Sequence, residues 1–312
     1  MRILLFGRNG QVGWELQRSL APLGEMVALD HRLEDNPVWE GRPLAGDFGD
    51  PEGLRDTVRR VRPDAIVNAA AHTAVDRAES EPELARCLNA TAVGVLAEEA
   101  ATLGAALVHY STDYVFDGSG DRPWTEGDTP APLNVYGRTK LEGEQLVQRH
   151  CPKHLIFRTS WVYAARGGNF AKTMLRLGQE RDALSVIDDQ HGAPTGAELL
   201  ADVTAHALRQ LLRGDSQCAG LYHLVAGGET TWHGYASLVL QTAREAGVPV
   251  RVAQDAIAAV PTSAFPTPAR RPLNSRLSTT RLQQTFGLVL PDWQQGVRRM
   301  LAEIRPDGKA AK

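Results

Sequence analysis

Short apolar runs and amphipathic stretches alternate along the first half of the chain. Mostly apolar runs, typical of strands buried on both faces, cover residues 3–6, 26–30, 65–68 and 105–110. Apolar residues recur at helical spacing in residues 14–23, 51–61 and 89–103. Strands that alternate with helices in this way predict an α/β fold, a Rossmann-type doubly wound parallel sheet.

The pattern changes in the second half of the chain. One more apolar strand is predicted at residues 155–157, and helices then dominate, at residues 170–179, 197–212 and 232–246. We therefore predict a dinucleotide-binding Rossmann domain over residues 1–168, joined by some later segments. Residues 169–304 are predicted to form mainly a smaller C-terminal substrate-binding domain, and residues 305–312 a flexible tail.

Composition narrows the function classes. Of the 312 residues, 43% are hydrophobic and 23% are charged, as in ordinary globular proteins. The net charge of -3 gives no electrostatic reason to expect nucleic acid or a membrane as partner. Three widely spaced cysteines indicate neither a disulfide framework nor a zinc site. The first apolar run stops at Gly7, too short for a signal peptide, so we expect a cytoplasmic protein.

A glycine-rich turn follows the first predicted strand. Gly7, Gly10 and Gly13 are spaced three apart, with Gln11 and Val12 before the last of them. Strand, glycine turn and helix together direct backbone N–H groups and a helix N-terminus at a pyrophosphate. The spacing differs from the commoner Gly-x-Gly-x-x-Gly fingerprint. A glycine turn without a nucleotide is the weaker alternative.

The second predicted strand ends in Asp30, about 20 residues beyond the turn, where a carboxylate holds a ribose hydroxyl. This favours NADH. Arg32 follows closely and is able to accept a 2′-phosphate, which leaves NADPH open. Asp47 and Phe48 fit the segment beside the adenine, although packing alone explains Phe48 equally well.

Small residues follow the third predicted strand. Ala71 and Thr73 would let a flat cofactor lie close to the backbone. His72 between them has two interpretations, a ligand or base and a structural loop histidine, and the structural one is favoured.

Candidate catalytic residues lie at the end of the fourth predicted strand, which contains or precedes Tyr110, Thr112 and Asp113. Open parallel sheets bind ligands at this end of their strands. Tyr136 and Lys140 follow a loop, and on a helix their spacing of four places them on one face. An adjacent ammonium favours the phenolate, which would make the phenol a competent acid near neutral pH. Taken alone, such a pair is more often a coincidence of a surface helix.

The order of several motifs is more specific than any one of them. They occupy residues 7–16, 68–76, 110–116, 132–140, 158–163, 192–202 and 266–277. Over essentially its whole length the chain resembles the dTDP-4-dehydrorhamnose reductases, a family of extended short-chain dehydrogenases/reductases.

This resemblance implies a reaction: NAD(P)H-dependent reduction of the C4 keto group of dTDP-4-dehydro-L-rhamnose to dTDP-L-rhamnose, a step toward cell-surface polysaccharide. It implies Tyr136 as proton donor, Lys140 as its modulator and a ribose partner, and Thr112 as the hydroxyl that positions the carbonyl. Asp113 and Trp161 are implied as contacts of the sugar or nucleotide. A core aromatic is the alternative for Trp161, because a strand precedes it.

Arg271 is a candidate for the substrate diphosphate because guanidinium groups match phosphate geometry. The resemblance also suggests a homodimer in which Glu15, Glu198 and Asp202 bind Mg2+ at the dimer contact. Glu198 and Asp202 are four apart near a predicted helix start, where carboxylates are favourable without any metal.

Two other functions stay open. Related dehydratases carry an Asp-Glu pair after the threonine, whereas here Tyr114 follows Asp113. Another nucleotide-sugar reductase or an epimerase is harder to separate by motifs. A non-catalytic protein, similar to the regulatory subunit of methionine adenosyltransferase, would not need a proton donor, so the presence of Thr112, Tyr136 and Lys140 favours an enzyme.

Overall fold

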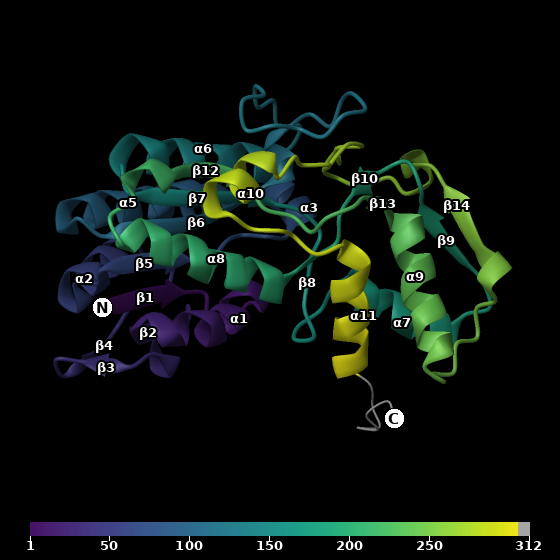
Figure 1. Cartoon of the computed structure of the whole chain (residues 1–312), viewed down its shortest axis with the longest axis horizontal. Helices are drawn as coiled ribbons and strands as arrows, with labels where there is room; N and C mark the ends of the chain where they lie inside the picture. The colour runs from purple at the N-terminus through teal and green to yellow at the C-terminus, as the bar shows by residue number, and fades with distance from the viewer. Residues whose placement is uncertain (305–312) are drawn as a thin grey trace.

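A six-stranded parallel sheet forms the centre of the computed structural model, which describes residues 1–304 (Figure 1). In spatial order the strands are β12-β7-β6-β5-β1-β2. Their bounds are β1 (Arg2–Phe6), β2 (Glu25–Leu29), β5 (Ala65–Asn68), β6 (Ala106–Thr112), β7 (His154–Thr159) and β12 (Gly220–His223). The predicted doubly wound α/β fold is confirmed. The predicted tail, residues 305–312, lies outside the described residues.

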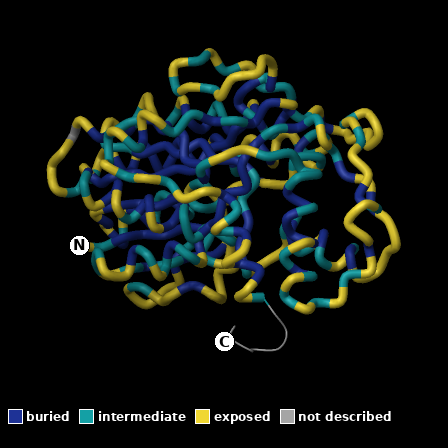
Figure 2. The backbone as a smooth tube through the Cα atoms, turned by 45° about the vertical axis from the view of Figure 1, so that its right-hand side comes forward, coloured by how far each residue is buried: buried dark blue, intermediate teal, exposed yellow. Residues whose placement is uncertain are grey.

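Helices cover both faces of the sheet because successive strand residues point to opposite sides. Ile3 and Leu5 of β1 belong to the core shared with α1 and α8, whereas Leu4 and Phe6 belong to the core shared with α2 and α5. All four side chains are fully buried, and the buried strands run through the middle of Figure 2. The helices are α1 (Gln11–Leu20), α2 (Pro51–Val61), α5 (Ala92–Leu103), α6 (Val135–His150) and α8 (Ala197–Leu212).

The strand order places a crevice at one end of the sheet. Strand β1 lies between β2 and β5, so the chain moves first to one side of β1 and then to the other. In an open parallel sheet, such a reversal leaves a ligand crevice beyond the carboxyl ends of the strands. The glycine turn and the residues after β2, β5 and β6 all lie at these ends.

Later parts of the chain divide between the sheet and a second lobe, on the right in Figure 1. Helix α8 packs on α1, and β12 pairs with β7, so residues 197–223 belong to the sheet side. The lobe has its own core, which includes Tyr235, Val239 and Val297. Its elements are α7 (Phe170–Glu180), β9 (Leu184–Ile187), α9 (Trp232–Glu245), β14 (Ile257–Val260) and α11 (Trp293–Glu303).

Short elements complete the chain. The predicted helix over residues 89–103 starts as a π-helical turn at Cys87–Thr91 and continues as α5. The other short helices are α3 (Val75–Ser80), α4 (Pro82–Arg86) and α10 (Thr280–Phe286). Two-residue strands are β3 (Val38–Trp39), β4 (Arg42–Pro43), β8 (Val162–Tyr163), β10 (His191–Gly192), β11 (Thr195–Gly196) and β13 (Thr230–Thr231). Among the described helices, none has the length and apolar character needed to span a membrane.

Candidate active site

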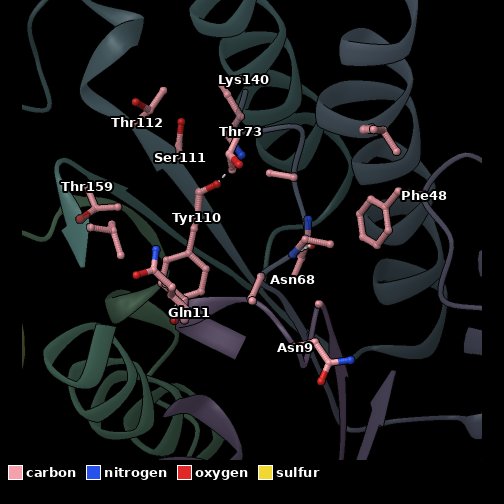
Figure 3. A pocket seen from close by; sticks show the side chains of 18 of the residues that line it. Asn9, Gln11, Phe48, Asn68, Thr73, Tyr110, Ser111, Thr112, Lys140 and Thr159 are labelled. Atoms are coloured by element: carbon pink, nitrogen blue, oxygen red, sulfur yellow. Dashed lines mark hydrogen bonds between the residues drawn. The ribbon is translucent and has the colours of Figure 1, made fainter. Parts of the chain in front are cut away.

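A cavity of about 1100 Å³ lies at the carboxyl ends of β1, β2, β5 and β6, and Trp232 of α9 reaches it from the second lobe. Figure 3 shows side chains around it, from Asn9 beside the glycine turn to Lys140 on α6. The predicted site residues that line it are Gly7, Gly10, Gln11, Val12, Asp30, Arg32, Asp47, Phe48, Ala71, Thr73, Tyr110, Thr112, Asp113, Tyr136, Lys140 and Trp161. One cavity therefore brings together the three predicted catalytic residues and most of the predicted cofactor residues.

The glycine turn is held by close backbone packing. Gly7 has a φ of +81°, a conformation that other residues rarely adopt. A Cβ on Gly13 would lie only 2.0 Å from the carbonyl oxygen of Gly7, so this position admits no side chain. Gly13 does not line the cavity, but it lets α1 begin directly under the turn. Gly10 at the N-cap of α1 supplies no capping side chain, as suits a helix end that receives an anion.

The end of β2 presents a buried carboxylate to the cavity. Asp30 is 5% exposed, and its Oδ1 accepts a 2.7 Å hydrogen bond from the backbone N–H of His31. Burial opposes ionisation, but the hydrogen bonds and charge of His31, with a contribution from Asn9, lower the pKa of Asp30. The carboxylate is therefore ionised at neutral pH and able to accept hydrogen bonds from ribose hydroxyls. Arg32 lines the cavity from an exposed position.

Phe48 packs in the core and also lines the cavity, and its place beside the adenine stays a prediction. Its ring is 3% exposed and packs edge-on against Phe6, with ring centroids 5.6 Å apart. It also lines the cavity, as does Asp47, whose carboxylate accepts from the backbone N–H of Gly49.

Tyr136 and Lys140 lie on the first turns of α6, which Asn134 caps by accepting a 2.8 Å hydrogen bond from the N–H of Gly137. Burial raises the pKa of Tyr136 to about 12, partly opposed by the hydroxyl of Thr112. The expected stabilisation of the phenolate by the lysine does not dominate here. The Lys140 ammonium instead donates a 2.5 Å hydrogen bond to the carbonyl of Tyr110. A neutral phenol at physiological pH is the form that a proton donor requires.

Unpartnered polar atoms gather where β6 and β7 end. Ser111 Oγ, Asp113 Oδ2 and Thr159 Oγ1 are buried and have no hydrogen-bond partner among the described residues. Burial raises the pKa of Asp113 to about 7, against the effect of hydrogen bonds with Ser275 and Thr112. Of these residues, Ser275 lies outside the cavity lining, and the lining includes Ser111, Thr112, Asp113 and Thr159. Because buried polar groups are nearly always satisfied, this cluster is suited to a ligand rich in hydroxyls.

Trp161 connects the sheet with the second lobe. Its φ of +49° is uncommon for a bulky residue. Its ring stacks on Trp232 at a centroid distance of 3.7 Å, and Trp232 Nε1 donates to Gln190 Oε1 at 2.9 Å. Both rings line the cavity, so Trp161 is more than a core aromatic.

Besides Gly13, the predicted cofactor residue His72 and the predicted substrate residue Arg271 lie outside the cavity lining. His72 is buried, its backbone N–H donates to Asn89 Oδ1, and its ring lies 3.6 Å from a Glu81 oxygen, which fits the structural interpretation. Arg271 makes two 2.7 Å hydrogen bonds to the carboxylate of Asp76, and this pairing lowers the pKa of Asp76. The Arg271 guanidinium is thus engaged by protein oxygen atoms, and its role as a diphosphate ligand stays a prediction.

The predicted metal ligands also lie away from the cavity. Arg18 contacts Glu15 at 3.5 Å and Asp202 at 3.0 Å, while burial raises the pKa of Glu198. No group of three acidic, histidine or cysteine side chains able to hold a metal occurs within the described part of this single chain. The arrangement of these residues inside one chain does not support Mg2+. The predicted homodimer stays a prediction.

Some cavity residues were not predicted as site residues. Ser111, Thr159 and Ser160 stand inside motifs that carry the family resemblance, so the motif order is a signal that identifies them. Arg166 and Trp232 line the cavity as well, and no local pattern marks them.

A family model described as RmlD substrate binding domain matches residues 1–305. The chain belongs to the RmlD substrate binding domain family. A dTDP-4-dehydrorhamnose reductase from Shigella flexneri is 63% identical to it, over 97% of this chain and 98% of the relative. One from Burkholderia thailandensis is 48% identical over 95% and 97% of the two chains. A crystal structure of the Bacillus anthracis reductase in complex with NADP is 34% identical, with a TM-score of 0.84 and coverage of 97% and 99%.

The match to the RmlD family runs through both the sheet and the second lobe. The cavity lies between these parts, and its lining includes residues from Gly7 to Trp232. The region that aligns with the family therefore includes every element that contributes residues to the cavity.

Proposed function

We propose that this protein reduces the C4 keto group of dTDP-4-dehydro-L-rhamnose with NAD(P)H and so forms dTDP-L-rhamnose. The observation that carries the proposal is the meeting of Tyr136, Lys140 and Thr112 in one cavity with the glycine turn and Asp30. Reductases of this name at 63% and 48% identity, aligned over nearly the whole chain, support the choice of substrate.

The residues present fit a dinucleotide. The uncapped start of α1 would hold the pyrophosphate, and the buried carboxylate of Asp30 would hold the adenosine ribose. The buried polar atoms of Ser111, Asp113 and Thr159 remain for the sugar nucleotide and the nicotinamide end. The bound cofactor would supply the hydride that adds to C4.

The protein's own residues supply the proton. Tyr136 donates its phenolic hydrogen to the carbonyl oxygen, so that the C4 carbonyl becomes an alcohol while an O–H bond of Tyr136 breaks. Thr112 orients that carbonyl, because its Oγ1 is held by the backbone N–H of Tyr114 at 3.1 Å. Lys140 is anchored by the Tyr110 carbonyl one helical turn beyond Tyr136, where its charge stabilises the developing phenolate.

The test is direct. The purified chain, mixed with dTDP-4-dehydro-L-rhamnose and NADPH, is expected to oxidise one cofactor for each dTDP-L-rhamnose formed, measured by nicotinamide absorbance and by mass spectrometry of the sugar nucleotide. An epimerase would convert the sugar without net oxidation, and a regulatory subunit would cause neither change. A panel of other 4-keto sugar nucleotides measures specificity in the same assay.

Both cofactors are expected to serve, because Asp30 and Arg32 line the same part of the cavity. We expect kcat/KM values for NADH and NADPH within a thousandfold of each other. Arg32→Ala is expected to lower kcat/KM for NADPH by about 10-fold or more, the loss of a hydrogen bond to a charged group, with little change for NADH.

Arg42→Ala provides the control, since Arg42 is also exposed but pairs with Asp56 outside the cavity lining. It is expected to leave the ratio of the two kcat/KM values unchanged. A thousandfold gap in the unmodified protein would refute dual use.

A further inference from the structure

A chain of buried polar groups runs along one wall of the cavity, from β5 through β6 to α6. Asn68 and Lys140 line the cavity, whereas His109 between them does not. Asn68, His109 and Lys140 are 1%, 0% and 2% exposed. Asn68 Nδ2 lies 3.1 Å from His109 Nδ1, and His109 Nε2 lies 3.4 Å from Lys140 Nζ. Proton donation by Tyr136 involves Lys140 but gives no role to Asn68 or His109.

The hydrogen bonds have one possible direction. The backbone N–H of Ala70 donates to Asn68 Oδ1 at 2.9 Å, which fixes the amide so that its nitrogen faces His109. If the amide were turned over, its NH2 group would face the backbone N–H of Ala70, and two donors would point at each other. An amide nitrogen only donates, so Nδ1 of His109 must accept. The hydrogen of the neutral imidazole is therefore on Nε2.

This tautomer directs an N–H bond at Lys140. An ammonium has three donors and no lone pair, so it cannot accept from Nε2–H, whereas the neutral amine can. Lys140 Nζ still has an acceptor in the Tyr110 carbonyl, drawn as a dashed line in Figure 3. The contact with His109 is thus repulsive for the ammonium and favourable for the amine.

The charges around the two residues agree with this direction. Burial lowers the pKa of Lys140 to about 8, opposed by Glu144 on the same helix, which pairs with Arg158 of β7. Burial and the Lys140 charge hold the pKa of His109 well below its usual range, so the imidazole stays neutral. Tyr136, one turn earlier on α6, is the remaining titratable neighbour on that helix face.

We propose that Asn68 and His109 are positioning residues that act through Lys140. By holding the hydrogen on Nε2 of His109, they favour the neutral amine of Lys140 and set the upper pH limit of the site. The position of the hydrogen on His109 follows from the directions of the hydrogen bonds alone. Its consequence for turnover rests on the proposed reduction.

The tautomer itself is measurable without activity. In the full chain carrying ¹⁵N-histidine, long-range ¹H–¹⁵N spectra are expected to show His109 protonated at Nε2, with its signal identified by loss in His109→Gln. His223 is an internal reference: it is also fully buried, but its Nδ1 faces the Trp124 carbonyl at 3.1 Å and must carry the hydrogen. Protonation of His109 at Nδ1 would overturn the proposal.

The pH dependence of kcat tests the consequence. Turnover of the unmodified protein is expected to fall as the pH rises through about 8, where Lys140 loses its charge. In Asn68→Asp the second carboxylate oxygen accepts from Nδ1–H, which reverses the tautomer and lets Nε2 accept from Lys140. The falling limb should then move up by about one pH unit or more, the effect of one hydrogen bond to a charged group.

His109→Gln removes the imidazole without adding a charge, and its amide oxygen is free to turn toward Lys140, so the limb should move in the same direction. His223→Gln makes the same substitution at a buried histidine of β12 and should leave the limb in place. Limbs unchanged in both Asn68→Asp and His109→Gln would contradict the inference. Absence of turnover in the unmodified protein would instead contradict the proposed function, and the tautomer measurement would still decide the structural part.

Discussion

Replacing Tyr136 by phenylalanine is expected to lower kcat at least ~100-fold, the scale of general acid catalysis, while the affinity for cofactor is largely kept. The substitution removes one oxygen from a ring that lines the cavity on α6. The ring keeps its edge-on contact with Tyr114, whose centroid lies 5.6 Å away. Steady-state kinetics and cofactor titration by fluorescence measure the two effects separately.

Tyr222→Phe is a suitable control for that experiment. Tyr222 is buried beside β7, and its hydroxyl donates to the Cys218 carbonyl at 2.8 Å, away from the cavity. Loss of that bond is expected to cost about 1 kcal/mol of unfolding free energy and to leave kcat unchanged. Near-normal turnover by Tyr136→Phe would refute its role as proton donor.

Replacing Glu144 by glutamine is expected to lower the free energy of unfolding by about 3–5 kcal/mol, because it leaves the Arg158 guanidinium buried without a counter-charge. The two side chains are 2% and 4% exposed and form two hydrogen bonds, of 2.9 and 2.6 Å. Urea unfolding followed by circular dichroism measures the change.

Glu142, two residues earlier on the same helix, offers the matched comparison. It pairs with Arg86 at 2.8 Å, but its side chain is 36% exposed and that of Arg86 58%. Solvent screens such a pair, so Glu142→Gln is expected to change the unfolding free energy by about 1 kcal/mol or less. Equal losses in the two variants would mean that burial does not govern the contribution of Glu144.

Much of the site was predictable because its parts are encoded locally. Gly7, Gly10 and Gly13 mark a turn whose need for small residues follows from backbone geometry, and the structure places Gly13 in contact with Gly7. Tyr136 and Lys140 share a helix face by spacing alone. Asp30 ends a strand that its apolar run already predicts.

Other features depended on packing between distant segments. Trp232 lies 71 positions after Trp161, yet their rings stack across the boundary between the sheet and the second lobe. Arg271, the predicted ligand of the substrate diphosphate, pairs with Asp76, nearly 200 positions away, and no local pattern indicates this partner.

The sequence by itself determined the alternation of strands and helices, the glycine turn and the spacing of the tyrosine and lysine, because these depend on near neighbours along the chain. Only the tertiary structure decided which partners the side chains have. In the sequence, His109 is a single polar residue in a buried strand. It affects Lys140 because the packing of β5, β6 and α6 brings it into contact with both Asn68 and Lys140. The direction of a hydrogen bond depends on all of its neighbours at once, and that information is absent from any local pattern.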